Sequence, residues 1–398
     1  MTRLSQRIAD IVESQTLAMT KKARELKAAG RDIISLSIGE PDFNTPTYIC
    51  DAADSAAKQG HTHYPPVAGI PELRAAVCEK LQKENGLHFT DDQIMVSSGA
   101  KQSLINAVLA LVNPGDEVIL PAPYWVSYPT MVQYAGGTVV PIQTEARSEF
   151  KASAEQLEAA ITDRTRLLIF SSPCNPSGSV MSQEELAAWA EVLKRHPQVF
   201  IISDEIYEHI QYGQTHQSLA QFEELRDRLA IVNGFSKGYA MTGWRLGYLA
   251  GPKDLVQACD KIQGLFTSGA NSVAQWAGVA ALRGDQSEVK AMCQTFESRR
   301  NLVLQELRTI PKLNIPTPAG AFYVFPDVQA YYGKTTPNGA VIANGEVLCL
   351  YILEQVGVSC VSGSGFGSPE CIRLSYAANE DSLREACARL KQAFASLS

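Results

Sequence analysis

Residues 166–204 read RLLIFSSPCNPSGSVMSQEELAAWAEVLKRHPQVFIISD, and this stretch determines the fold that we expect. It holds two continuous apolar runs, 166–170 and 199–202, separated by a turn and an amphipathic segment. Ser182 and Glu185 form a capping box, which predicts that a helix starts there. Two apolar strands joined through a helix are typical of neighbouring parallel strands that are covered on both faces. The stretch therefore predicts an α/β fold.

The same alternation extends in both directions along the chain. Seven short apolar runs predict a mostly parallel seven-stranded sheet: 94–96, 117–120, 138–142, 166–170, 199–202, 229–232 and 246–250.

After Asp285 the pattern changes to a long charged helix followed by strand-like segments near Phe322 and Arg373. We expect a smaller α+β domain here. The helical pattern 17–29, which ends at Gly30, is expected to pack against it. The predicted organisation is a large domain (46–285) and a small domain assembled from both chain ends (1–45 and 286–398).

Composition excludes several classes of protein. The 398 residues are 45% hydrophobic, and the formal charge of -7 comes without basic clusters, so small molecules are expected as partners and nucleic acid is not. The nine cysteines include no C-x-x-C pair, which indicates reduced thiols and no zinc site or other metal site. With no signal-peptide pattern and no long apolar segment, we expect a cytoplasmic protein without membrane contact.

Polar residues follow several of the predicted strands, where ligands of open α/β sheets bind. Gly99 and Ala100 lead into a helix after the first run, an arrangement that binds phosphate or forms a plain turn. Lys237 follows the run 229–232; desolvation would lower its pKa and suit it to form a Schiff base, whereas the alternative is a solvated lysine. Arg245 suits a phosphate or an ordinary surface position.

Asp204 ends a buried run, so it suits either pairing with a protonated ring nitrogen or capping of a following helix. On that helix, Tyr207 would share its face and reach a ring oxygen. Asn175 fits turn chemistry or side-chain donation, Trp125 fits ring stacking or core packing, and Arg373 fits carboxylate binding or exposure.

These residues, in this order, resemble the aspartate aminotransferase family, class I pyridoxal-phosphate (PLP) enzymes of fold type I. The similarity extends over nearly the whole chain. It is carried by SIGEPDFNTP (37–46), YPPVAGIPELR (64–74), SGAKQ (98–102), PYWVSY (123–128), SPCNPSG (172–178), SDEIY (203–207), SKGYAMTGWRLGY (236–248) and IRLSYA (372–377).

The resemblance implies roles for the matching residues. Lys237 would be the Schiff-base lysine and proton shuttle, with Asp204 on the pyridinium nitrogen and Tyr207 and Asn175 on the ring oxygen. Trp125 would stack on the ring. The phosphate would be held by Gly99, Ala100, Arg245 and, from the neighbouring subunit of a homodimer with shared sites, Tyr64. Ser236 would also contact the cofactor.

Substrate contacts are implied in the same way. Arg373, helped by Asn175 and the backbone of Gly39, would bind the α-carboxylate. Lys101 would meet a distal carboxylate, and Trp125 would also contact the substrate. The implied reaction is therefore ping-pong amino transfer between aspartate and 2-oxoglutarate, giving oxaloacetate and glutamate.

Other functions remain as alternatives. They are an alanine, aromatic or kynurenine aminotransferase, a PLP-dependent C–S β-lyase, and the effector domain of a transcription regulator, which the short segment before residue 46 and the negative charge disfavour. Val12 and Glu13 stand where Lys-Pro is frequent in this branch and is linked to prephenate acceptance, so prephenate activity is not expected. Cys174 and Ser177 also differ from the usual asparagine and threonine, but Asn175 is retained.

Overall fold

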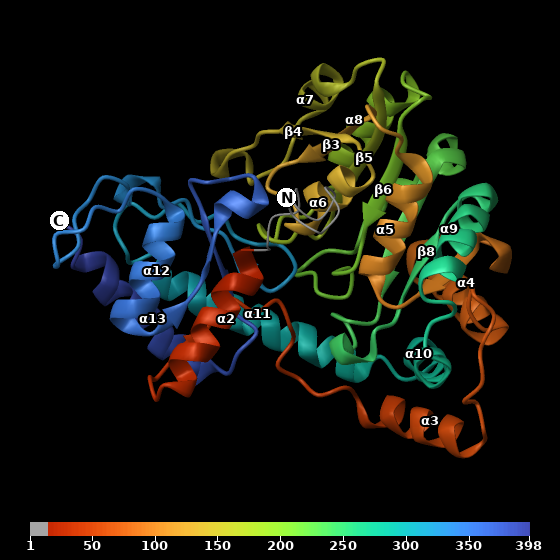
Figure 1. The fold of residues 1–398 in the computed structure, drawn as a ribbon, viewed down its shortest axis with the longest axis horizontal. Coiled ribbons are helices and arrows are strands. Elements are labelled where there is room, and N and C mark those ends of the chain that lie inside the picture. The colour runs from red at the N-terminus through yellow and green to blue at the C-terminus, as the bar shows by residue number, and fades with distance from the viewer. Residues whose placement is uncertain (1–14) are drawn as a thin grey trace, which may run out of the picture.

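The computed structural model describes residues 15–398, and a seven-stranded sheet forms its centre (Figure 1). All seven predicted strands are present, in the order β2-β8-β7-β6-β5-β3-β4. Only β8 runs antiparallel to its neighbours, so the prediction of a mostly parallel sheet is confirmed. The strands are β2 (Ile94–Ser97), β3 (Glu117–Pro121), β4 (Thr138–Ile142), β5 (Thr165–Ser171), β6 (Phe200–Asp204), β7 (Leu229–Gly234) and β8 (Gly247–Ala250).

Successive side chains of each strand point to opposite sides of the sheet, and in β2, β7 and β8 every residue is buried, so both faces are covered there. In β5, Leu168 and Phe170 enter one core together with Trp189 of a covering helix. Leu167 and Ile169 enter the other core. The continuous apolar pattern that predicted these strands is thus explained by two-sided burial.

Helices cover the two faces as separate sets. On one side lie α4 (Pro71–Asn85), α8 (Gln183–Lys194) and α10 (Ser272–Arg283). The other is covered by α5 (Ala100–Leu111), α6 (Ser127–Tyr134) and α9 (Lys253–Phe266), of which α5 and α9 are seen in front of the sheet in Figure 1. The remaining helices of this part are α3 (Thr47–Lys58), packed on α10, and α7 (Ala154–Ala160), packed on α8.

The second part of the molecule brings the two chain ends together. Strand β1 (Ile34–Ser35) pairs in parallel with β10 (Val358–Ser359), and Figure 1 shows α2 (Gln15–Ala28) among the blue C-terminal elements. A separate apolar core is formed here by Leu36, by Tyr207, Ile210 and Tyr212 from the segment after β6, and by residues from Phe296 onward. Its other elements are α11 (Ser287–Leu307), α12 (Gly345–Val356), α13 (Glu380–Ala395), β9 (Tyr323–Val324), β11 (Val361–Ser362) and β12 (Ile372–Ser375).

Short 3-10 turns connect many of these elements: η1 (Asp91–Gln93), η2 (Ala146–Ser148), η3 (Leu219–Gln221), η4 (Glu223–Arg228), η5 (Thr242–Trp244), η6 (Gln329–Tyr331) and η7 (Gly363–Phe366). None of the helices between residues 15 and 398 is both long and apolar enough to span a bilayer.

One expectation about local structure is wrong. We predicted that Asp204 and Tyr207 share a helix face, but residues 206–209 form turns after β6 and no helix starts there. The Asp204 carboxylate instead accepts a bond from the Ile206 amide at 3.2 Å, which favours a tight turn over a helix. The predicted domain boundaries at residues 45 and 285 stay predictions, although α11 begins at Ser287.

Candidate active site

A cavity of about 320 Å³ lies where the carboxyl ends of the central strands meet the second part of the molecule. It is lined by eleven of the predicted site residues: Gly39, Ala100, Lys101, Trp125, Asn175, Asp204, Tyr207, Ser236, Lys237, Arg245 and Arg373. Strands and loops of the sheet supply most of these, whereas Gly39 and Arg373 come from the two chain ends. The cavity therefore depends on both parts of the chain.

Lys237 enters the cavity from the turn after β7. Its Nζ donates to the backbone oxygen of Gly39 at 2.6 Å. Burial lowers the pKa of this amine to about 8, and the nearby Arg373 and Arg245 guanidinium groups act in the same direction against Glu40 and Asp204. The neutral amine, which is the nucleophilic form, is thus accessible near neutral pH.

Asp204 is buried at the end of β6, with 5% of its surface exposed. The Tyr128 hydroxyl of α6 donates to its Oδ2 at 2.6 Å. Burial raises the pKa of Asp204 to about 6, while the bonds from Tyr128 and the Ile206 amide oppose that rise. A carboxylate in this setting is suited to hold a cation or a protonated ring nitrogen.

Arg373 lies on β12 with 2% of its surface exposed, so the alternative of an exposed arginine does not apply. Its Nη1 donates to Asn175 Oδ1 at 2.9 Å and its Nη2 to the backbone oxygen of Ser37 at 2.7 Å. Both partners are neutral oxygens. The guanidinium keeps its full charge and further N–H groups for an anion in the cavity.

Gly99 and Arg245 build a second anion site at the start of α5. Gly99 has φ of +89°, and a Cβ there would come within 2.7 Å of Arg245 Nη2, so a side chain would close the space between them. Gly247 is equally constrained, because a Cβ there would collide with the backbone nitrogen of Ala100. Small residues thus let a helix N-terminus and an arginine approach one ligand, the usual setting for phosphate.

Lys101 and Trp125 form one wall of the cavity, with the Lys101 ammonium 4.8 Å from the centre of the indole ring. Within residues 15–398, Lys101 has no carboxylate partner. Tyr64 is 95% exposed and does not line the cavity.

Sequence reasoning missed two tyrosines that line the cavity. Tyr128 was inside a quoted motif, but nothing in its spacing indicated a bond to Asp204. Tyr323 lies on β9 and bonds the hydroxyl of Tyr207 at 2.8 Å. A tyrosine amid apolar residues gives no signal that its hydroxyl faces a cavity.

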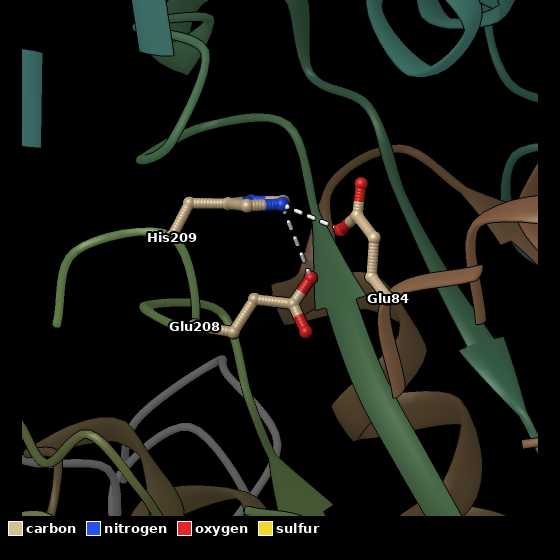
Figure 2. A group of neighbouring side chains, drawn as sticks. All are labelled: Glu84, Glu208 and His209. Atoms are coloured by element: carbon tan, nitrogen blue, oxygen red, sulfur yellow. Dashed lines mark hydrogen bonds and ion pairs between the residues drawn. The ribbon is translucent and has the colours of Figure 1, made fainter. Parts of the chain in front are cut away.

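Behind the site, carboxylates and imidazoles form two groups with spacing that a metal ion could use: Glu84, Glu208 and His209, and Glu205, Glu208 and His216. Figure 2 shows the His209 ring pointing toward both glutamates of the first group; its Nε2 lies 3.1 Å from Glu84 Oε2 and 3.5 Å from Glu208 Oε1. The buried Lys80 ammonium already pairs with Glu208. The Lys80 ammonium is thus already the cationic partner of Glu208, which both groups share, and we assign no metal to either group.

Comparison with known proteins is consistent with these features. Residues 31–390 match the family model described as "Aminotransferase class I and II". The aspartate/prephenate aminotransferase of Cereibacter sphaeroides is 50% identical over the full length of both chains. Among solved structures, the aspartate aminotransferase from Rhizobium meliloti is similar with a TM-score of 0.97, 43% identity and full coverage of both chains. The Thermus thermophilus aspartate aminotransferase with maleate has a TM-score of 0.93 and 39% identity, covering 99% of this chain and 100% of that one.

The fold and site define a PLP-dependent enzyme that acts on amino acids and 2-oxo acids. More narrowly, the chain belongs to the class I and II aminotransferase family. The expected family and fold type are therefore confirmed.

The residues present fit PLP. The space between Gly99 and Arg245 suits a phosphate, the buried Asp204 suits the pyridine nitrogen, and the partly neutral Lys237 suits the aldehyde.

Proposed function

We propose that this protein transfers the amino group between L-aspartate and 2-oxoglutarate as a cytoplasmic, PLP-dependent homodimer. The observation that carries the proposal is the presence of two cations, Arg373 and Lys101, in the same cavity as Lys237. A substrate with two carboxylates matches two cations, whereas alanine or phenylalanine would leave Lys101 unpaired.

Five residues hold the phosphate and cover the ring of the cofactor in this proposal. The amide groups at Gly99 and Ala100, together with Arg245 and Ser236, hold the phosphate. Trp125 covers the ring. When bound, PLP supplies a conjugated ring that withdraws electrons from the substrate's Cα.

Proton movement rests on the groups around Lys237. Asp204, kept ionised by the bond from Tyr128, holds the ring nitrogen protonated, while Asn175 and Tyr207 donate to the ring oxygen. With the cofactor in place, Lys237 would be the base that removes and shuttles the proton at the substrate's Cα. Its lowered pKa lets it act as a base near neutral pH.

Arg373 orients the substrate. Its guanidinium is fixed by Asn175 and Ser37, so the α-carboxylate meets a donor pair that needs no rearrangement. The Thermus thermophilus relative is described with maleate, a dicarboxylate, and the relatives' names specify aspartate; both support the assignment of a second carboxylate to Lys101.

The homodimer is supported by an exposed apolar patch formed by Tyr64, Leu265 and Phe266, which are 95%, 86% and 66% exposed. The two segments of the patch lie together, since a Cβ at Gly269 would be 2.9 Å from Pro65. Large apolar side chains that are exposed together on a surface are typical of an association site. In a homodimer this patch would bring Tyr64 to the partner's phosphate site.

The decisive experiment compares amino acids in single-turnover reactions with the PLP-loaded enzyme. We expect aspartate and glutamate to react faster than alanine and phenylalanine, and Lys101→Gln to reduce kcat/KM for aspartate about 10- to 100-fold while sparing alanine. Lys253→Gln, which alters an exposed pair with Asp92, is the matched control. Equal rates for all amino acids would overturn the dicarboxylate assignment, and release of pyruvate, ammonia and a thiol from an S-substituted cysteine without an oxo-acid acceptor would identify a β-lyase.

Prephenate forms part of the same experiment. The residues that argue against it, Val12 and Glu13, lie outside the described residues, whereas the Cereibacter sphaeroides relative is named as an aspartate/prephenate enzyme. Our prediction stays that prephenate is a poor acceptor. Turnover with prephenate comparable to that with 2-oxoglutarate would show it to be wrong.

A further inference from the structure

Two pairs of buried tyrosines share the core of the C-terminal part, and they differ in where their protons go. In the first pair, Tyr212 and Tyr376 both donate to the backbone oxygen of Ala321, Tyr376 at 3.1 Å. Both hydroxyl protons therefore have acceptors. In the second pair, Tyr207 and Tyr323 share one bond of 2.8 Å, and within residues 15–398 neither hydroxyl has another partner. One proton of this pair is left for a ligand in the cavity.

The surroundings of Tyr323 favour it as the donor within the pair. Its ring lies under the Arg373 guanidinium, 4.6 Å from the ring centre. Burial raises the pKa of both phenols and Arg373 acts against that rise in both, but of the two rings it is Tyr323 that stacks on the guanidinium, which favours its hydroxyl as the donor. The hydroxyl is also packed against Gly39, where a Cβ would come within 2.5 Å of it, so it has little room to turn elsewhere.

We infer that Tyr323 is a positioning residue that donates its proton to Tyr207 and thereby directs the Tyr207 proton to the ring oxygen of the cofactor. The inference rests on the proposed function, because it needs PLP in this cavity. Arg373 then links substrate and cofactor, since the residue that binds the α-carboxylate also stacks on the phenol behind Tyr207.

The expected consequence is spectroscopic. In the loaded enzyme the ring oxygen shares a proton with the lysine nitrogen, and a bond donated to that oxygen weakens its hold on the proton. A hydroxyl that itself accepts a bond is a stronger donor, because hydrogen bonds in chains polarise one another. Loss of the Tyr323 hydroxyl should therefore move the titration of the visible absorbance band to higher pH.

The experiment titrates this band in the PLP-loaded wild type and in Tyr323→Phe. We expect the midpoint of the variant to be higher by about half a pH unit, the effect of weakening one neutral hydrogen bond. Tyr376→Phe removes an equally buried hydroxyl from the same core and should leave the midpoint unchanged. In a Tyr207→Phe background, adding Tyr323→Phe should have no further effect.

Each outcome decides the matter. An unchanged midpoint in Tyr323→Phe, or a further shift in the double variant, would overturn the inference. If Tyr323→Phe does not fold, Gly39→Ala tests the same contact by displacing the hydroxyl, with a shift in the same direction expected and no shift contradicting it. A wild type that forms no visible band with PLP would instead refute the proposed function.

Discussion

The turn from Asp204 to His209 separates two sets of buried charges that differ in how fully they are paired. Asp204 and Tyr207 line the cavity. Glu205 and Glu208, from the same turn, face away from it. There Glu205 accepts from Ser218 at 2.6 Å and lies 2.9 Å from His216 Nε2, while Glu208 pairs with Lys80.

The difference separates structural charges from functional ones. Behind the turn each buried charge has a partner from the protein, so its interactions are complete in the folded chain. Inside the cavity, the cations Lys237 and Arg373 bond, among residues 15–398, only to neutral backbone or amide oxygens. Charges held in place without a counter-charge are those available to a ligand.

The largest effect is expected from removing the amine of the cavity. Lys237→Ala should lower turnover at least about 10⁴-fold, because no other described group can move the proton at Cα, while PLP still binds through its phosphate. Steady-state rates and cofactor retention after gel filtration measure the two properties. Near-normal turnover would show that Lys237 is not the proton shuttle.

On the other side of the turn, the expected loss is in stability. Lys80→Met leaves Glu208 buried without its cation and should lower the free energy of unfolding by about 3–5 kcal/mol, with the turnover of the remaining folded protein little changed. Denaturant unfolding measures this. Lys58→Met, at an exposed pair with Asp54, is the control and should have no measurable effect.

The pH dependence of that stability has a defined sign. Burial raises the pKa of Glu208, but Lys80, His209 and His216 outweigh burial and hold it at about 2, below its ordinary value of 4.5. A depressed carboxyl pKa stabilises the protein above the ordinary value, and the contribution is lost as pH falls towards 2. The difference in free energy of unfolding between wild type and Lys80→Met should therefore narrow as the pH falls from 4.5 towards 2. A difference that stays constant with pH would contradict the assignment.

A smaller effect is expected in the pH dependence with which the amines of Lys237 and Lys58 react with a labelling reagent. In PLP-free protein, labelling of Lys237 by trinitrobenzenesulfonate should rise with pH around a midpoint near 8, because only the neutral amine reacts. Lys58 is the internal control: its hydrogen bond to Asp54 raises its pKa above 10.5. Peptide mass spectrometry measures both in one sample, and equal midpoints would mean that Lys237 is not desolvated.

The smallest effect is expected from removing the hydrogen bond that the Tyr128 hydroxyl donates to Asp204. Tyr128→Phe removes the bond to its Oδ2 and should raise its pKa further, so less of the carboxylate is ionised and kcat falls about 10- to 100-fold. The pH profile of kcat should move to higher pH as well. Tyr124→Phe, four positions earlier and outside the cavity, is the control; a Tyr128→Phe profile identical to wild type would remove Tyr128 from the mechanism.

The sequence allowed the seven strands to be predicted because most of them are buried on both faces and therefore largely apolar, whereas the edge strand β4 was indicated by its β-branched residues although it is partly exposed. It also indicated Lys237, Asp204 and Arg373, since polar residues at strand ends or inside apolar segments stand out. The bonds of Tyr128 and Tyr323 were not predictable, because each joins segments more than 70 residues apart. The turn after Asp204 was mistaken for a helix because the aspartate side chain bonds its own backbone two residues on, an arrangement that helix periodicity does not reveal.

The pairing of β1 with β10 has a consequence for how the protein is made. Synthesis delivers the whole central sheet, with Lys237 and Arg245, once residue 250 has left the ribosome. The strand that holds the N-terminal segment, and Arg373 after it, emerge more than a hundred residues later. A nascent chain can therefore form the part that binds the cofactor well before it can bind a substrate. Cofactor binding can begin during translation, whereas amino transfer requires the last strand.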